Sequence, residues 1–489
     1  MHLITSLRKL LGLVILGAML GLVADAAESG EVRAGAFAQP ISPTKFPTPV
    51  NGNMKGNFAS SVHDHMHARC LAIHDGRQEL LLCVVDACMI PRDICEQAKE
   101  IVAEKTGVPR ANILISATHT HSAATLTPVF QSDADPEYVA SVPQRIAQGM
   151  LQAHQNLEPA EIGWAKASNP TQVFNRRWLM KEGETSADPF GSLTDRVKMN
   201  PGYRNAQVER PAGPVDPEVS VLAVRAKMDQ RPLALFANYS LHYVGGNPPI
   251  SADYFAAFAD EIAQRLKVSD ERYQNKPPFV GIMSNGTSGN INNVDYSSAP
   301  PPRPMPGEQI RTVASSVAET ALQAYNTISF RSETTLDSIE EDIRLKVRKP
   351  TISELEAAQK ILETTPRDKD GQFSDRTATY ARESVLLAAY PDEVPVKLQV
   401  MRIGDLSIAA IPCEVFVEIG LDLKQRSPFD GHFTISLANG YNGYLPTAQH
   451  HVWGGYETWR ARSSYLEVSA ADQITQQLVK MLGELKTRL

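Results

Sequence analysis

Side chains that could bind a metal ion stand directly after apolar segments of this 489-residue sequence. His119 and His121 are two positions apart, so their imidazoles would point to the same side of an extended backbone. His242 and Glu414 follow two other apolar segments. A catalytic zinc ion typically has about three imidazole or carboxylate ligands and keeps one position for water. His119, His242 and Glu414 would supply that set; the alternative is a hydrogen-bonded polar rim that only holds loops together.

Further groups could contribute to such a site. Arg176 and Arg177 form a basic pair, which can grip a carboxylate or a phosphate or brace a site. The stretch 284–293 (SNGTSGNINN) allows a ligand to approach its backbone closely, and it lacks the lysine of a phosphate-binding P-loop. Three alternating histidines would share one strand face and allow a second metal ion, with exposed histidines as the alternative. They are His63, His65 and His67.

The elements that must position these groups repeat the order strand, helix, strand three times. The predicted strand pairs are 79–87 with 112–118, 233–239 with 279–283, and 406–411 with 432–437. The helices between them are predicted from Asp93, as N-cap, to Gly107, at about 254–267, and at 415–424. Two more helices are expected at 308–325 and 469–485, and the polar, partly helical segment 329–400 reads as an inserted subdomain or lid.

The fold class follows from the character of these strands. Continuous apolar runs are typical of parallel strands that are covered on both faces. We therefore expect an α/β fold with a mixed, largely parallel sheet flanked by helices. Ligands of such sheets bind beyond the carboxyl ends of the strands, where the histidines, Glu414 and Tyr444 would meet the polar loop 284–293. This rim is the predicted metal site.

The N-terminus predicts export. Arg8 and Lys9 precede the apolar run 10–23, and Ala24-Asp25-Ala26 has the small residues of a cleavage site. We expect a signal peptide at 1–26 and a mature chain at 27–489; the alternative is an uncleaved anchor. No other apolar run reaches the length of a membrane span, so none is expected in the mature chain.

Composition excludes several classes of protein. The formal net charge is −7, so a nucleic acid is not an expected partner. The five cysteines are odd in number and lack CxxC spacing, which indicates buried thiols rather than a disulfide scaffold or a zinc cage. Oligomeric state cannot be predicted from these features.

The sequence also resembles a known family over nearly the whole mature chain. The matching segments are 33–35 (RAG), 41–43 (ISP), 116–122 (SATHTHS), 215–219 (VDPEV), the strand that ends at His242, 284–293, 412–414 (PCE), 443–444 (GY) and 455–457 (GYE). In these segments the chain resembles the neutral/alkaline non-lysosomal ceramidases, zinc-dependent amidases that hydrolyse the N-acyl bond of ceramide.

The resemblance implies specific roles. The zinc ligands would be His119, His242, Glu414 and Tyr444. His121 and Tyr456 would handle protons and stabilise the oxyanion, and one of the two arginines, Arg176 or Arg177, would be the active-site arginine. The substrate would be an N-acylated lipid of the sphingolipid type.

The chain departs from the family pattern at two places. Asn292 occupies the position of the family's nucleophilic serine, and an amide cannot attack a carbonyl, although it can donate a hydrogen bond to an oxyanion. We therefore expect water activated by zinc to be the nucleophile; the alternatives are a zinc-pocket binding protein, or a zinc hydrolase of esters or phosphates. The C-terminal immunoglobulin-like domain of many members is not expected here.

Overall fold

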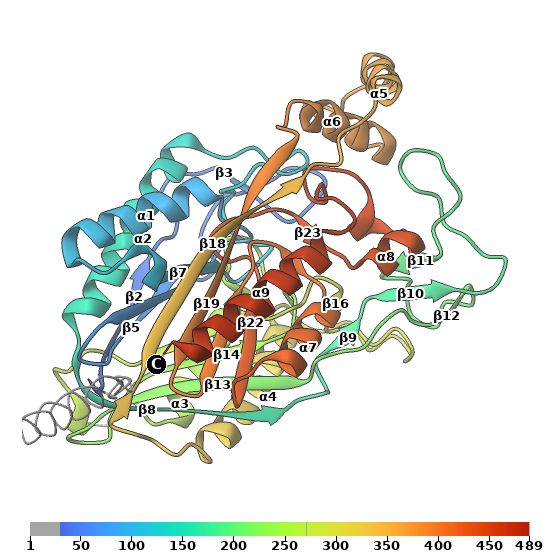
Figure 1. Ribbon diagram of the computed structural model, residues 1–489. Helices are drawn as coiled ribbons and strands as arrows, with labels where there is room; N and C mark the ends of the chain where they lie inside the picture. Colours follow the sequence, from blue (N-terminus) through green and yellow to red (C-terminus); the bar gives the residue numbers. More distant parts are fainter. Residues whose placement is uncertain (1–29, 270, 489) are drawn as a thin grey trace, which may run out of the picture.

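The computed structural model describes residues 30–269 and 271–488, and the predicted signal peptide lies outside them (Figure 1). Its largest element is an eight-stranded sheet in the order β15-β14-β13-β8-β2-β5-β6-β7. In that order the strands are Val280–Asn285, Pro232–Tyr239, Glu218–Ala226, Glu158–Ser168, Arg33–Pro40, His67–His74, Glu79–Val85 and Ile113–Ala117. A second sheet has the order β18-β19-β20-β22, made of Leu336–Lys346, Glu393–Ile403, Leu406–Ala410 and Gly431–Ile435.

The two sheets pack face to face and are covered by helices on their outer faces, so the chain forms four layers (Figure 1). The helices α1 (Arg92–Thr106) and α2 (Pro136–Gln155) cover β5, β6 and β7. The helices α3 (Asp253–Arg265) and α4 (Glu308–Tyr325) cover β13, β14 and β15. The helices α7 (Val417–Arg426) and α9 (Ala470–Thr487) cover the second sheet.

The predicted mixed α/β architecture is confirmed, but the sheet is not largely parallel. The three predicted strand pairs, β6 with β7, β14 with β15 and β20 with β22, are parallel as expected. All other neighbouring strands of the large sheet are antiparallel. The strands are apolar along their length because both faces of the large sheet are covered, whatever the direction of the strands. In β6, for example, Leu82 packs between the two sheets, whereas Leu81 packs under helices.

The predicted helices are present with small shifts at their ends. The helix α1 begins at Arg92 with Pro91 as N-cap, so Asp93 lies in its first turn instead of capping it. Gly107 ends this helix as predicted, in the left-handed conformation with φ of 78°.

The segment 329–400 is not a separate lid throughout, because β18 and β19 are strands of the second sheet. Between them the chain leaves the sheet and forms α5 (Ile352–Thr364) and α6 (Arg376–Ala388), which project from the end of the two strands (Figure 1). We call residues 351–389 the helical cap.

Short strands and one short helix build the rim beneath this cap. They are β3 (Thr48–Val50) with β4 (Asn57–Ala59), β9 (Phe174–Asn175) with β16 (Ile291–Asn292), β21 (Glu414–Val415) with β23 (Tyr444–Leu445), and β10 (Arg177–Met180) with β11 (Val197–Met199) and β12 (Val208–Pro211). The helix α8 spans Ala448–Trp453, and β1 (Gly30–Glu31) pairs with β17 (Glu333–Thr334) away from the large sheets.

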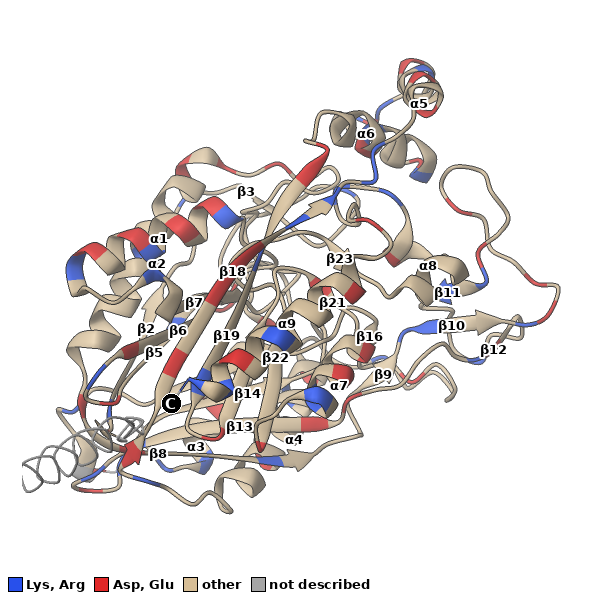
Figure 2. Ribbon diagram, viewed as in Figure 1, with Lys and Arg blue, Asp and Glu red and all other residues tan. Residues whose placement is uncertain are grey.

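Charged residues of both signs lie on the helices. Positive and negative residues alternate along α1 and α9 (Figure 2). Within 30–269 and 271–488, no helix has both the length and the apolar character of a membrane span. All five cysteines are buried and free, and burial raises the pKa of the Cys95 thiol to about 12, so this thiol is protonated at neutral pH.

Candidate functional site

The candidate metal ligands lie at the carboxyl ends of strands in different parts of the molecule. His119 follows β7 and His242 follows β14, which stand in opposite halves of the large sheet. The segment after β22 connects them, because Leu437 accepts a hydrogen bond from the N–H of Ala117 and Ser436 donates one to Asn285. This crossing brings the two halves of the rim together.

Glu414 and Tyr444 are aligned by a short parallel ladder. They are direct register partners in β21 and β23, so their side chains leave the backbone next to each other. The phenol of Tyr441 donates a hydrogen bond of 3.1 Å to Oε1 of Glu414 and thereby leaves Oε2 facing His119. The carboxylate is 5% exposed.

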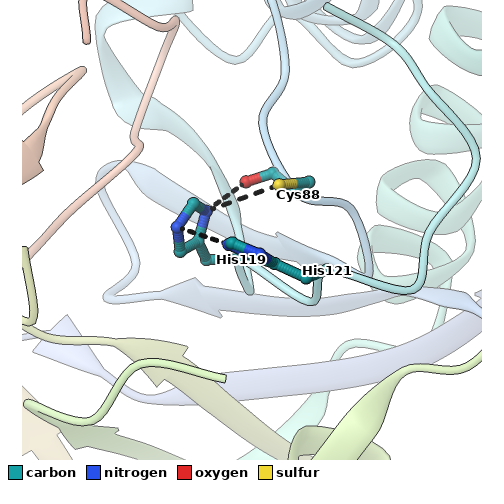
Figure 3. A group of neighbouring side chains, drawn as sticks. All are labelled: Cys88, His119 and His121. Atoms are coloured by element: carbon teal, nitrogen blue, oxygen red, sulfur yellow. Dashed lines mark hydrogen bonds between the residues drawn. The ribbon is translucent and has the colours of Figure 1, made fainter. Parts of the chain in front are cut away.

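Three imidazoles converge beside this carboxylate. Nε2 of His119 lies 3.1 Å from Nε2 of His242, 3.2 Å from Nε2 of His121 and 3.1 Å from Oε2 of Glu414. Nδ1 of His119 donates to the carbonyl of Cys88 at 2.7 Å, as Figure 3 shows. Nδ1 of His242 likewise donates to the carbonyl of Ser288 at 3.1 Å, so both rings turn Nε2 toward the same point.

This donor set fits a zinc ion. Each Nδ1 is committed to a backbone carbonyl, so both Nε2 atoms can coordinate a cation once His119 has lost its second proton. A tetrahedral site with bonds of about 2.0–2.1 Å separates its ligand atoms by about 3.3 Å, close to the distances observed here. Oε2 of Glu414 is buried and receives no hydrogen bond. His119 has a positive φ of 74°, a strained conformation that often marks a functional residue.

Only one of the two adjacent arginines reaches the cluster. Nη2 of Arg176 donates to the phenol of Tyr444 at 3.1 Å, and Nη1 lies 3.2 Å from Nε2 of His242. Arg177 instead donates to the carbonyl of Gly454 at 2.6 Å. Both arginines pair with Glu457, which is fully buried.

A small cavity opens beside the cluster. Its volume is about 30 Å³, and its lining residues are Asn51, Gly52, Asn53, Cys88, Met89, His119, His121, Val129, Phe130, Glu414, Tyr441, Tyr444, Tyr456 and Ser463. The imidazole of His121 stacks on the ring of Tyr243, with the ring centres 3.7 Å apart. The ring of Tyr456 stands edge-on to Tyr444 at 5.8 Å.

Burial and neighbouring charges set the protonation states. Burial lowers the pKa of His119, but Glu414 and Cys88 outweigh it and raise the pKa to about 10. Burial, together with the charges of Arg176 and His119, lowers the pKa of His121 and of His242 well below the usual value. Burial and then Glu414 raise the pKa of Tyr456, so its phenol is protonated at neutral pH.

The other predicted positions lie apart from this cluster. Asn292 is in β16, does not line the cavity, and donates its amide to Oδ1 of Asn200 at 2.9 Å. His63 and His65 are exposed, and the two groups of adjacent metal-type ligands found in 30–269 and 271–488 include none of the three alternating histidines. The second metal ion considered for His63, His65 and His67 is therefore not supported.

Three residues near the cluster were missed by the sequence reasoning. Tyr441 supports Glu414, Tyr243 stacks on His121, and Glu457 holds both arginines. Each is adjacent or nearly adjacent in sequence to a predicted residue, which was the available signal. Their contacts span up to 281 positions, so local sequence could not reveal them.

Comparison with known proteins identifies the fold. No protein-family model and no curated protein sequence matches the chain. Among solved structures, neutral ceramidase from Pseudomonas aeruginosa matches with a TM-score of 0.69 and 16% identity, covering 94% of this chain and 75% of that one. A ceramidase complexed with C2 matches with a TM-score of 0.68 and 15% identity, covering 94% of this chain and 76% of that one. The chain therefore has the fold of the neutral ceramidases.

Proposed function

We propose that this protein is an exported, zinc-dependent hydrolase that cleaves the amide bond of an N-acylated substrate. The observation that supports the proposal most is the convergence of His119, His242 and Glu414, whose ligand atoms lie within 4.8 Å of one another. The ceramidase-like fold points to amide chemistry on an N-acylated, sphingolipid-type molecule. Export rests on the predicted signal peptide, and a mature N-terminus at residue 27 would support it.

His119, His242, Glu414 and Tyr444 would hold the metal. Zinc at this position would supply a Lewis acid for the amide carbonyl and make water nucleophilic near neutral pH. His121 presents Nε2 at the edge of the cluster, so it would accept the proton of the attacking water as general base. Tyr456 lines the cavity as a protonated phenol and would donate a hydrogen bond to the developing oxyanion.

Arg176 would orient Tyr444 and add positive charge beside the reacting carbonyl. Its guanidinium donates to the phenol of Tyr444, and Glu457 holds it from the other side. Because Glu457 and Arg176 are both buried, the guanidinium has one fixed position.

Metal analysis of variants tests the ligand set. His119→Ala and Glu414→Ala should each abolish zinc retention, because each removes one of the converging ligands. His63→Ala is the matched control, since that imidazole is exposed, and it should keep the zinc content of the wild type. Stoichiometric zinc in either site variant would contradict the proposal.

Asn292 favours a second candidate, a protein that binds its ligand in the zinc pocket without turning it over. By the sequence resemblance, Asn292 would occupy the position of the family's nucleophilic serine, and its amide donates a hydrogen bond to Asn200. Under the hydrolase proposal, Asn292→Ala lowers turnover by less than about tenfold, because the amide does not line the cavity. Zinc-loaded protein that cleaves no member of a panel of chromogenic amides, esters and phosphates, with Asn292→Ser gaining amidase activity, would favour the binding protein.

A further inference from the structure

Two buried cysteines, Cys70 and Cys83, take no part in the proposed chemistry and lie opposite each other in the large sheet. They are register partners in the antiparallel strands β5 and β6, and their Sγ atoms are 3.4 Å apart. Both are 0% exposed and belong to the apolar cluster between these strands and the helices α1 and α2. The two side chains therefore leave the sheet on the same face and meet.

The hydrogen-bond pattern of the ladder shows which kind of pair they form. Hydrogen-bonded and non-hydrogen-bonded pairs alternate along antiparallel strands. The N–H of Asp86 donates to the carbonyl of His67 at 2.9 Å. At the other end of the two strands, the N–H of Asp75 donates to the carbonyl of Gln78 at 3.2 Å. The cysteine pair lies three positions from the first of these pairs and five from the second, both odd numbers, so it is a non-hydrogen-bonded pair.

A pair of this kind has the spacing that a disulfide bond requires. Residues in non-hydrogen-bonded pairs have Cα atoms about 4.5 Å apart, and disulfides span about 4.4–6.8 Å between Cα atoms. The Cβ atoms of such pairs approach to about 4.5 Å, which is the upper end of the usual disulfide range of about 3.5–4.5 Å. The two cysteines can therefore be joined with little movement of the backbone.

We propose that Cys70 and Cys83 form a disulfide bond when the chain folds in an oxidising compartment. The inference rests on the export that the proposed function includes, because disulfides form and persist outside the reducing cytosol. The odd number of cysteines then leaves Cys88, Cys95 and Cys413 as free thiols.

The oxidant is a glutathione-type disulfide, which takes up the two electrons. The thiolate of one cysteine attacks a sulfur of the glutathione disulfide, which gives a mixed disulfide and releases one glutathione thiolate. The thiolate of the other cysteine attacks the protein sulfur of the mixed disulfide and releases the second glutathione, and the two protons of the cysteine thiols end on the two glutathione thiolates. Burial, followed by the contact with Cys70, raises the pKa of the Cys83 thiol well above its ordinary value in the folded chain. The exchange therefore takes place before the helices cover the strands.

The bond would stabilise a strand that supports the candidate site. The strand β6 leads to Cys88, whose carbonyl accepts the hydrogen bond from Nδ1 of His119. The cross-link joins residues 13 positions apart and so restricts the unfolded chain. The oxidised protein should have an unfolding equilibrium constant about 100-fold smaller than that of the reduced protein.

Mapping of the cysteines after refolding tests the proposal. The reduced mature chain is unfolded in urea and refolded with zinc in a buffer of glutathione and glutathione disulfide. Free thiols are then alkylated, and the chain is digested for mass spectrometry. We expect one linked pair of peptides, which contain Cys70 and Cys83, and alkylated Cys88, Cys95 and Cys413. A fully alkylated chain, or a link between Cys83 and Cys95, overturns the proposal.

Two variants separate the bond from the burial of its thiols. Cys95→Ala is the matched control, because Cys95 is buried in the same cluster but lies on α1 instead of opposite Cys83. It should keep the linked pair, whereas Cys70→Ala should lose it. Dithiothreitol should lower the urea midpoint of unfolding of the wild type and of Cys95→Ala, and it should leave that of Cys70→Ala unchanged. Equal shifts in all three proteins would overturn the stabilising role.

The same map of protein recovered from an exported fraction distinguishes the failure of this inference from the failure of export. A mature N-terminus at residue 27 with alkylated Cys70 and Cys83 overturns the disulfide and supports export. An uncleaved chain found only in the cytosol refutes export, and the refolding map then decides the pair on its own.

Discussion

At the scale of single residues, Arg176 and Arg177 differ although the sequence makes them equivalent. Both pair with Glu457, but only Arg176 also reaches Tyr444 and His242. Arg177 points to the carbonyl of Gly454 and is fully buried. Arg176 therefore belongs to the candidate site, whereas Arg177 holds the segment that contains Gly454.

This difference predicts separable defects. Arg176→Gln should lower kcat/KM by about 100-fold with zinc retained, because a charged donor at the reacting carbonyl is lost. Both variants should lower the free energy of unfolding by about 3 kcal/mol, since Glu457 loses a buried partner in each, but Arg177→Gln should keep most of the wild-type kcat/KM because Arg177 does not reach Tyr444 or His242. Kinetics, zinc content and denaturant unfolding of the two variants provide the comparison. Equal activity losses in both would show that the arginines share one role.

At the scale of elements, the turn after β3 sets the position of His121. Gly52 has a φ of +110°, and a Cβ built there would lie 2.5 Å from Cβ and Cγ of His121. Only glycine fits both the backbone conformation and the contact. The turn of the β3–β4 hairpin thus limits where the imidazole of the proposed general base, His121, can lie. No sequence pattern indicates that Gly52 contacts His121.

Gly52→Ala should therefore displace His121 and lower kcat by about 100-fold or more, while zinc content stays the same. Gly183→Ala provides the control, because Gly183 also has a positive φ, of +81°, but no atom within 4 Å of an added Cβ. Both variants bear the backbone strain, and only Gly52→Ala bears the clash. Activity that falls equally in both would assign the effect to strain alone.

At the scale of the whole molecule, buried histidines link stability to pH. His432 in β22 is 7% exposed, and its Nδ1 lies 2.8 Å from Oγ of Ser407. Burial, helped by the charge of Lys424, lowers its pKa from 6.5 to about 3. The folded protein keeps this imidazole neutral between those values, whereas the unfolded chain binds a proton below about 6.5. Unfolding therefore becomes more favourable as the pH falls through that window.

The contribution of His432 should reach about 2 kcal/mol at pH 5 relative to pH 7.5. His432→Gln should remove it and flatten the pH dependence of the free energy of unfolding, even if the variant is less stable at pH 7.5 through loss of the hydrogen bond to Ser407. Urea unfolding of the wild type and the variant at both pH values measures the difference. Parallel pH dependences would show that His432 does not carry this linkage.

Local sequence was enough to predict five helices and the three parallel strand pairs, because hydrophobic periodicity and helix signals act within one element. It did not predict the helix α2 or the strands β2, β8, β13, β18 and β19. The helix α4 spans Glu308–Tyr325 as its pattern predicts, and β14 differs from its predicted run by one residue. The motif resemblance likewise pointed to His119, His242, Glu414 and Tyr444 as one set. Each of these signals is contained in a few neighbouring residues.

The tertiary structure alone decided how these elements combine. The strands β13 and β14 are antiparallel although both are buried along nearly their whole length, with helices on one face and the second sheet on the other. The site itself and the separation of Arg176 from Arg177 depend on contacts between positions hundreds of residues apart. Such contacts are set by packing of the whole chain, and no local pattern of residue types encodes them.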